Sequence, residues 1–113
     1  MQIVRFAAKS EIKYGLLYQQ RVQGLAADPF LSFQNGTSFE KDGSDYLLSE
    51  VKLLAPCLPS KVVCLGLNYR PHAKEIKEAL PANPLLFLKP STAVIGPEEF
   101  IILPKDHKRV DHE

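Results

Sequence analysis

A histidine and a glutamate three residues apart form the clearest candidate for chemistry in this sequence. His72 and Glu75 lie in a run of good helix formers, so their side chains share one face and can approach each other. A carboxylate that accepts from one imidazole nitrogen fixes the tautomer and makes the other nitrogen a better base. Taken alone, however, this spacing is more often an exposed histidine beside a solvated glutamate.

Three residues near this pair could contact a ligand. Lys89 follows the apolar run LLFL and precedes a proline, so its ammonium emerges at a strand end, where it could bind an anion or simply face water. Tyr69 is a candidate substrate contact, although its ring could equally belong to a core with the hydroxyl at the surface. Gly66 fits either a tight turn between strand and helix or a position beside a ligand.

The C-terminus carries side chains that could bind a divalent cation. Carboxylate oxygens and imidazole nitrogens are common ligands, but alternation along a strand puts Asp111 and Glu113 on one face and His112 on the other. The whole cluster therefore cannot converge on one ion, and a solvated charged turn is the default interpretation. Its members are Asp106, His107, Asp111, His112 and Glu113.

The elements that would position the His-Glu pair are two strands and a helix. The β-branched apolar run at 61–66 and the run LLFLK at 85–89 are both typical of buried strands. Between them a helix is predicted to begin near Pro71, because proline is favoured in a first turn, and to continue to Leu80, where further prolines end it. The sequence EFIIL at 99–103 predicts another strand, and Val110 to Glu113 resembles the start of one.

The first half predicts a small β-rich module. Its proline-containing segment APCLPSK interrupts strand pairing, so we expect a small N-terminal domain at 1–57 and a second, incomplete domain at 58–113. The fold class expected is β-rich α+β. Strands are predicted at 2–6, 13–18, 21–26 and 51–54, and turns at Asn35-Gly36 and Asp42–Asp45, where glycine accepts positive φ.

Composition narrows the function classes. The chain has 113 residues, of which 45% are apolar and 24% charged, which is typical of a folded globular protein and argues against disorder. A net charge of +1, spread along the chain, gives no footprint for nucleic acid. No signal peptide or membrane-spanning run is present, so we expect a cytoplasmic protein with no membrane partner. Cys57 and Cys64 are expected to be free, partly buried thiols.

Three blocks from Lys61 onward carry a resemblance to a known family. The order KVVCLGLNYRPHAKEIK, NPLLFLKPSTAVIGP and ILPKDHKRVDHE is similar to the opening of the catalytic domain of the fumarylacetoacetate hydrolase family. The match covers about half of the chain. The preceding part resembles, more weakly, the small β-rich domain found before this catalytic domain in many bacterial members.

The resemblance implies a mixed β-roll catalytic fold, often dimeric, that binds Mg²⁺ or Mn²⁺, sometimes Ca²⁺, and hydrolyses, decarboxylates or isomerises small 2-oxo acids. It places His72 and Glu75 on the family's proton-transfer pair and Lys89 near the substrate. Glu113 falls on the first glutamate of the E-x-E metal pair, usually seen as DYEAEL, with His112 in place of the tyrosine. It implies a homodimer.

The family's other metal ligands lie downstream of Glu113, and one carboxylate with waters binds Mg²⁺ weakly. We therefore expect little activity from this chain alone. The alternative is a non-catalytic remnant or assembly module of the same family. The sequence does not choose among the 2-oxo acids, the three reactions or the metals.

Overall fold

The computed structural model describes residues 2–106 and 110, and the chain divides into two compact units. Unit 1 comprises residues 1–56 and 95–113, and unit 2 comprises residues 57–94. Each contains one antiparallel sheet with short helices, which confirms the predicted β-rich α+β class. Among the described residues, no helix is long and apolar enough to cross a membrane.

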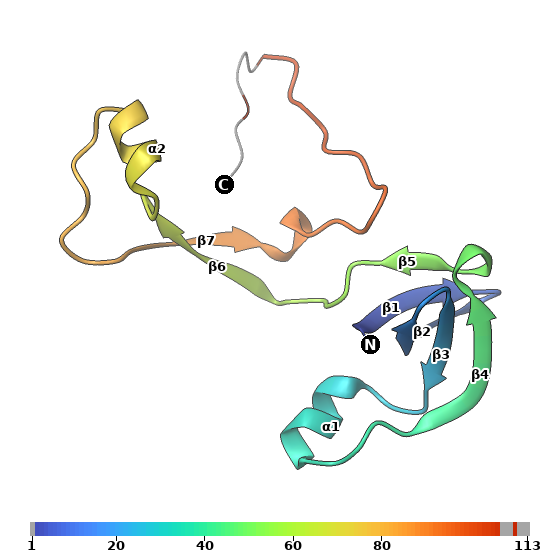
Figure 1. The fold of residues 1–113 in the computed structure, drawn as a ribbon. Coiled ribbons are helices and arrows are strands. Elements are labelled where there is room, and N and C mark those ends of the chain that lie inside the picture. The colour runs from blue at the N-terminus through green and yellow to red at the C-terminus, as the bar shows by residue number, and fades with distance from the viewer. Residues whose placement is uncertain (1, 107–109, 111–113) are drawn as a thin grey trace. The chain divides into compact units, whose positions relative to one another are not determined.

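Unit 1 is built on a five-stranded sheet in the order β4-β3-β2-β1-β5 (Figure 1). Consecutive strands β1 to β4 pair as a meander, and β5 closes the far edge against β1. A single turn of 3-10 helix, Leu48–Glu50, joins β4 to β5. The four predicted strands of this half are confirmed as β1 Gln2–Ala8, β2 Glu11–Tyr18, β3 Arg21–Leu25 and β5 Lys52–Leu54, whereas β4 Lys41–Leu47 was not predicted.

The core of unit 1 lies on one face of this sheet. Phe6 and Val22 are fully buried, and the ring of Phe6 meets that of Tyr46 edge-on at 5.7 Å between centroids. Gly15 allows the close approach, because a Cβ there would lie 2.8 Å from Phe6 and from Val22. The strand sequences alternate so that these apolar residues share the face.

A short helix, α1 (Pro29–Asn35), is absent from the sequence-based assignment. The Asp28 carboxylate accepts from the backbone N–H of Phe30 at 2.8 Å, Pro29 occupies the first turn, and Gly36 follows in the left-handed region at φ 64°. The turn predicted at Asn35-Gly36 is therefore the C-terminal cap of this helix.

The turn predicted at Asp42–Asp45 is wrong, because this segment belongs to β4. Its turn chemistry is nevertheless present as a local irregularity. Gly43 has φ 86°, Ser44 donates its backbone N–H to the Asp42 carboxylate at 2.8 Å, and the β3–β4 register shifts between Gln23 and Leu25. Pairing with β3 kept the segment extended around the bulge.

Unit 2 consists of β6 (Lys61–Gly66), α2 (Arg70–Glu75) and β7 (Leu85–Pro90), followed by a 3-10 turn at Ser91–Ala93 (Figure 1). The two strands are antiparallel, and Lys61 pairs with Pro90. Both strands were predicted and are present, but their predicted burial is wrong, because Val63 and Leu88 are more than 60% exposed. Among the described residues β6 and β7 pair only with each other, and the face that carries Val63 and Leu88 is exposed.

The helix in unit 2 is shorter than predicted. It ends at Glu75, not at Leu80, because Lys77 adopts a left-handed φ of 59°. The N–H of Glu78 then donates to the carbonyl of Ala73 at 2.9 Å, and that of Lys77 to Lys74 at 3.2 Å, which is a Schellman motif with lysine in the position that glycine usually occupies.

The strand predicted at 99–103 is also wrong, since this segment is irregular and its apolar side chains are exposed. The apolar pattern is suitable for a strand, but a strand needs a neighbour to satisfy its backbone groups, and none pairs with it in the described part of the chain. The strand start predicted at 110–113 lies outside the described residues except for Val110, which is not in a strand.

Candidate active site

The connection between β6 and α2 holds Gly66 and Tyr69 and leads directly to the pair His72 and Glu75. Gly66 pairs with Leu85 at the end of the sheet, and a Cβ on Gly66 would lie 2.9 Å from the Leu85 side chain. Leu67 follows with φ 50°, a conformation that costs a non-glycine residue about 1–3 kcal/mol and is concentrated at functional sites. The turn directs the chain into α2 within three residues.

The helix brings the predicted pair together. Nδ1 of His72 lies 3.7 Å from Oε2 of Glu75, at positions i and i+3, and both side chains are about half exposed. This separation allows an ion pair but is too long for a hydrogen bond. Catalytic hydrogen bonds are often longer in a ligand-free protein than in its complex, so the geometry is suitable for a proton-transfer pair.

Lys89 and Tyr69 have different surroundings. Lys89 lies on β7 opposite Val62, on the half-buried face of the sheet, and its Nζ is 5.9 Å from the ring centroid of Phe87. The ring orients the ammonium by a cation–π contact. Tyr69 immediately precedes α2 and is exposed, so a core role for its ring is excluded.

The predicted metal ligand Glu113 lies outside the described residues, as do His107, Asp111 and His112. Among the residues that are described, no three or more His, Cys, Asp or Glu side chains gather to hold a metal ion. Cys57 and Cys64 are free and half-buried, as predicted. The described part of the chain therefore brings His72 and Glu75 together but shows no cluster of metal-ligating side chains.

Unit 2 also contains a pocket of about 370 Å³ that the sequence did not reveal. Its charged residue is Arg70, the first residue of α2, and Asn68 and Asn83 also line it. An isolated arginine belongs to no recognisable sequence motif. The pocket also requires the segment at 80–85 to lie beside the end of β6. The only available signal was the position of Arg70 between Tyr69 and the helix that was predicted to begin near Pro71.

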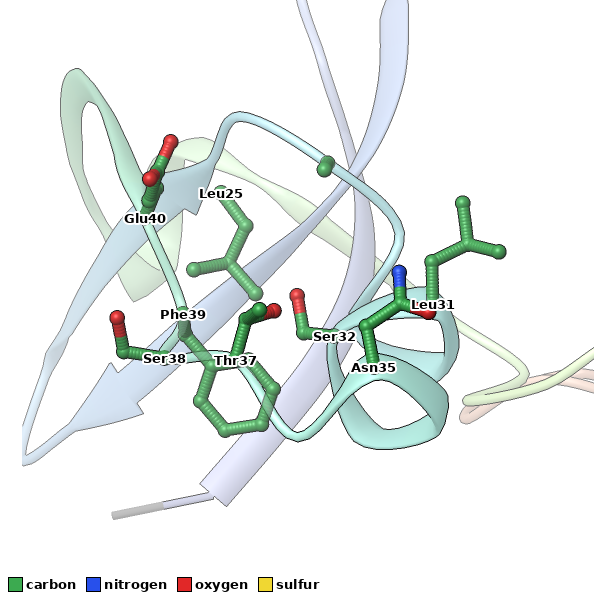
Figure 2. A pocket seen from close by; sticks show the side chains of 9 residues that line it. Leu25, Leu31, Ser32, Asn35, Thr37, Ser38, Phe39 and Glu40 are labelled. Carbon is green, nitrogen blue, oxygen red and sulfur yellow. The ribbon is translucent and has the colours of Figure 1, made fainter.

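A second pocket, of about 320 Å³, lies in unit 1 between α1 and the segment that leads into β4. Figure 2 shows the side chains of Ser32, Asn35 and Thr37 in this region, with Leu25 beside them. The charged residue in its lining is Glu40, which repels anions. This pocket is therefore a poor candidate for a 2-oxo acid.

Two family profiles match the chain, one on each side of the proline-containing segment. Residues 1–56 match "Rv2993c-like, N-terminal", and residues 61–113 match "Fumarylacetoacetate (FAA) hydrolase C-terminal". The chain belongs to the fumarylacetoacetate hydrolase family. The family is typically dependent on divalent metal ions.

Similar family members are known from archaea, bacteria and animals. An uncharacterized protein of Archaeoglobus fulgidus is 51% identical over 72 residues, which are 64% of this chain and 29% of that protein. The Rattus norvegicus protein named "Oxaloacetate tautomerase Fahd2a, mitochondrial" is 47% identical over 66 residues, 58% of this chain and 21% of its own length.

A crystal structure named as a 5-carboxymethyl-2-hydroxymuconate delta-isomerase from Mycobacterium smegmatis has a TM-score of 0.76 and 32% identity. The match covers 96% of this chain and 40% of that one. The chain thus spans less than half the length of each of these family members, and its relatives include isomerases and tautomerases.

Proposed function

We propose that this chain is the N-terminal portion of an enzyme that moves a proton on a small 2-oxo acid, as an isomerase or tautomerase does. The observation that carries the proposal is the approach of His72 to Glu75 at 3.7 Å on α2, in a family whose relatives bear isomerase and tautomerase names. The proposed domains are 1–57 and 58–113, and the proposed assembly is a cytoplasmic homodimer.

In the proposed reaction, neutral His72 acts as the general base. Glu75 accepts from Nδ1–H and so leaves the lone pair on Nε2, which removes a proton from the carbon next to the substrate's carbonyl. The C–H electron pair forms the new C=C bond, and the carbonyl electrons move to oxygen, which becomes an enolate. The imidazolium then returns the proton to that oxygen, which completes a tautomerisation, or to another carbon, which completes an isomerisation.

The other residues assist this transfer. Lys89 places a positive charge that stabilises the enolate or a carboxylate, and exposed Tyr69 contacts the substrate. Mg²⁺ or Mn²⁺, or Ca²⁺, is the proposed cofactor, with Glu113 as one ligand. No step above depends on the metal. In hydrolysis the neutral imidazole of His72 would activate water, and in decarboxylation the imidazolium would protonate the enolate.

The test uses a polypeptide that joins this chain to the remainder of a fumarylacetoacetate hydrolase domain. Enol-to-keto conversion of oxaloacetate is followed by ultraviolet absorbance. His72→Gln is expected to lower kcat about 100-fold or more, because a positioned base contributes about 10²–10⁴. Lys74→Gln removes a charge from the same helix and should leave kcat unchanged. Calorimetric Mn²⁺ binding should survive in both variants, and an unaltered kcat for His72→Gln would overturn the proposal.

A second candidate function is assembly without catalysis. Four apolar side chains of unit 2 form two cross-strand pairs on one exposed face of the sheet, Val63 with Leu88 and Leu65 with Leu86. Such a face favours contact with another protein surface. If the joined polypeptide lacks activity while Leu86→Lys changes its oligomeric state in sedimentation, the assembly role replaces the catalytic one.

A further inference from the structure

The pocket in unit 2 is lined by one charged residue, two amides and several leucines. It lies between the end of β6, the start of α2 and the segment at 80–85, and has a volume of about 370 Å³. Its size is suitable for a small organic molecule. The residues that give it this character are Leu65, Asn68, Arg70, Leu80, Asn83 and Leu85.

The polar groups of this pocket favour an anion. Arg70 is the charged residue of the lining, and no Asp or Glu from the described residues takes part. Arg70 is exposed, and no ion pair links it to any residue in the described part of the chain. Asn68 and Asn83, which also line the pocket, add side-chain amides with N–H donors. Five guanidinium N–H donors with adjacent amides match the acceptor-only oxygens of a carboxylate.

The apolar part of the pocket favours an organic acid over an inorganic anion. Leu65 and Leu80 line it together with Leu85, so a carbon chain attached to the carboxylate would leave water on binding. Pro81 and Pro84 restrict the backbone of one wall, which lowers the entropy lost when a ligand orders it.

We infer that this pocket binds the carboxylate of a small organic acid, with Arg70 as its anchor and the leucines around its carbon chain. The pocket is separate from the proton-transfer pair, because neither His72 nor Glu75 lines it. Arg70 and His72 are two positions apart on α2, and such positions point to different sides of a helix. The carboxylate could belong to a distinct ligand or to the far end of a substrate with two carboxylates.

A cationic pocket in unit 1 provides a comparison. It has a volume of about 340 Å³ and is lined by Arg21 and Lys41. The Arg21 guanidinium already donates to the Asp45 carboxylate at 3.0 Å, so part of the positive charge there is matched. Lys41→Gln therefore serves as a control for attraction to a cationic pocket in general.

The first experiment uses the 113-residue chain and two probes of equal size, pentanoate and the neutral pentanamide. Both are titrated while ¹H–¹⁵N spectra follow the Nε–H of Arg70 and the side-chain amides of Asn68 and Asn83. Pentanoate should give saturable shifts, with affinity at least about tenfold above that of pentanamide, because a charge-assisted hydrogen bond is lost with the amide.

Three variants separate this site from general charge effects. Arg70→Gln should abolish the preference for pentanoate, with backbone amide signals outside the pocket unchanged as the check on folding. Lys74→Gln, on the same helix but outside the pocket, and Lys41→Gln should each retain it. Shifts that do not saturate, equal affinity for the two probes, or equal loss in Lys74→Gln would overturn the inference.

The two sources of the carboxylate are then distinguished in the joined polypeptide. If the second carboxylate of a substrate occupies the pocket, Arg70→Gln lowers kcat/KM for oxaloacetate about tenfold and spares a 2-oxo monocarboxylate. If a distinct ligand occupies it, Arg70→Gln leaves kcat/KM for both substrates unchanged, while the unsubstituted polypeptide binds pentanoate and the variant loses the preference for it. Because the probe titration needs no catalysis, a failure of the His72 test leaves this inference standing, and the reverse also holds.

Discussion

Unit 1 and unit 2 are built from strands of similar apolar character, yet only unit 1 encloses a core. In unit 1 the five strands cover Phe6 and Val22 completely. In unit 2, Ala73 is the only buried residue among those described, and Leu86 and Leu88 on β7 are each about two-thirds exposed. The difference shows that apolar strands become buried only when enough neighbours cover them, since a lone two-stranded sheet is marginal in water.

The largest expected effect comes from the core of unit 1. Phe6→Ala should lower the free energy of unfolding by about 3–5 kcal/mol, because it removes a fully buried ring and leaves a cavity. The matched change in unit 2, Leu88→Ala, should cost less than about 0.5 kcal/mol because the side chain is exposed. Urea unfolding followed by circular dichroism measures both. Similar losses for the two variants would mean that β7 is covered in solution.

A smaller effect is expected where the sheet of unit 1 is most tightly packed. Gly15→Ala should cost about 1–3 kcal/mol, because the new methyl group meets Phe6, Val22 and the carbonyl of Gln23, each at 2.8 Å. Part of this cost should disappear in a Phe6→Leu background, since the smaller side chain gives room. A double-mutant cycle from urea unfolding measures the coupling, and strictly additive losses would contradict the predicted contact.

Acid should reveal a contact that only unit 1 contains. Hydrogen bonds from the Ser44 side chain and from Lys13, at 2.9 Å, lower the pKa of the Asp42 carboxyl from 3.8 to about 2. The contacts with Asp42 and Glu11 also raise the pKa of Lys13 above its ordinary value. Because the folded state holds Asp42 ionised, its stabilisation is complete above pH 3.8 and is lost as pH falls through about 2.

Asp42→Asn should therefore flatten the pH dependence of the unfolding free energy between about pH 4 and 2. Urea unfolding at several pH values across this window measures the slope for wild type and variant. Glu78→Gln in unit 2 should leave the slope of unit 1 unchanged. A slope that is the same in wild type and Asp42→Asn would show that the contact with Lys13 and Ser44 does not persist in solution.

The sequence predicted elements where local signals and tertiary partners agree. Strands β1, β2, β3 and β5 were predicted from the sequence, whereas β4 was not. The two-residue links between β1 and β2 and between β2 and β3 contain no glycine, although Lys9 and Gln19 have φ of 56° and 53°. Strand pairing enforces these conformations, so the residue types in the two links do not indicate the turns. In contrast, α1 had Asp28, Pro29 and Gly36 as signals, and its short length hid it.

For the candidate site, residue spacing was sufficient to predict the histidine–glutamate pair but not the pocket that Arg70 lines. The pair His72 and Glu75 could be predicted because positions i and i+3 of any helix lie on one face. The pocket of Arg70 depends on the segment at 80–85 lying beside the end of β6, which no short-range pattern encodes. The apolar pattern at 99–103 is typical of a strand. In the described part of the chain, however, no other strand pairs with this segment.

The smallest expected effect concerns the end of α2. Lys77 has the left-handed φ of 59° that glycine adopts without cost, so Lys77→Gly should stabilise the last turn of α2 by up to about 1 kcal/mol. The amide of Glu78, which donates to Ala73, should then exchange more slowly with deuterium. Lys74→Gly, inside the same helix, should do the opposite.

This comparison also tests which unit limits stability. Because unit 2 buries little, its helix is expected to open locally without unfolding unit 1, so Lys77→Gly should slow exchange at Glu78 and leave exchange at Val22 unchanged. Equal slowing at both amides would mean that the two units unfold together. Faster exchange at Glu78 would show that Lys77 contributes a contact of greater value than the relief of its backbone conformation.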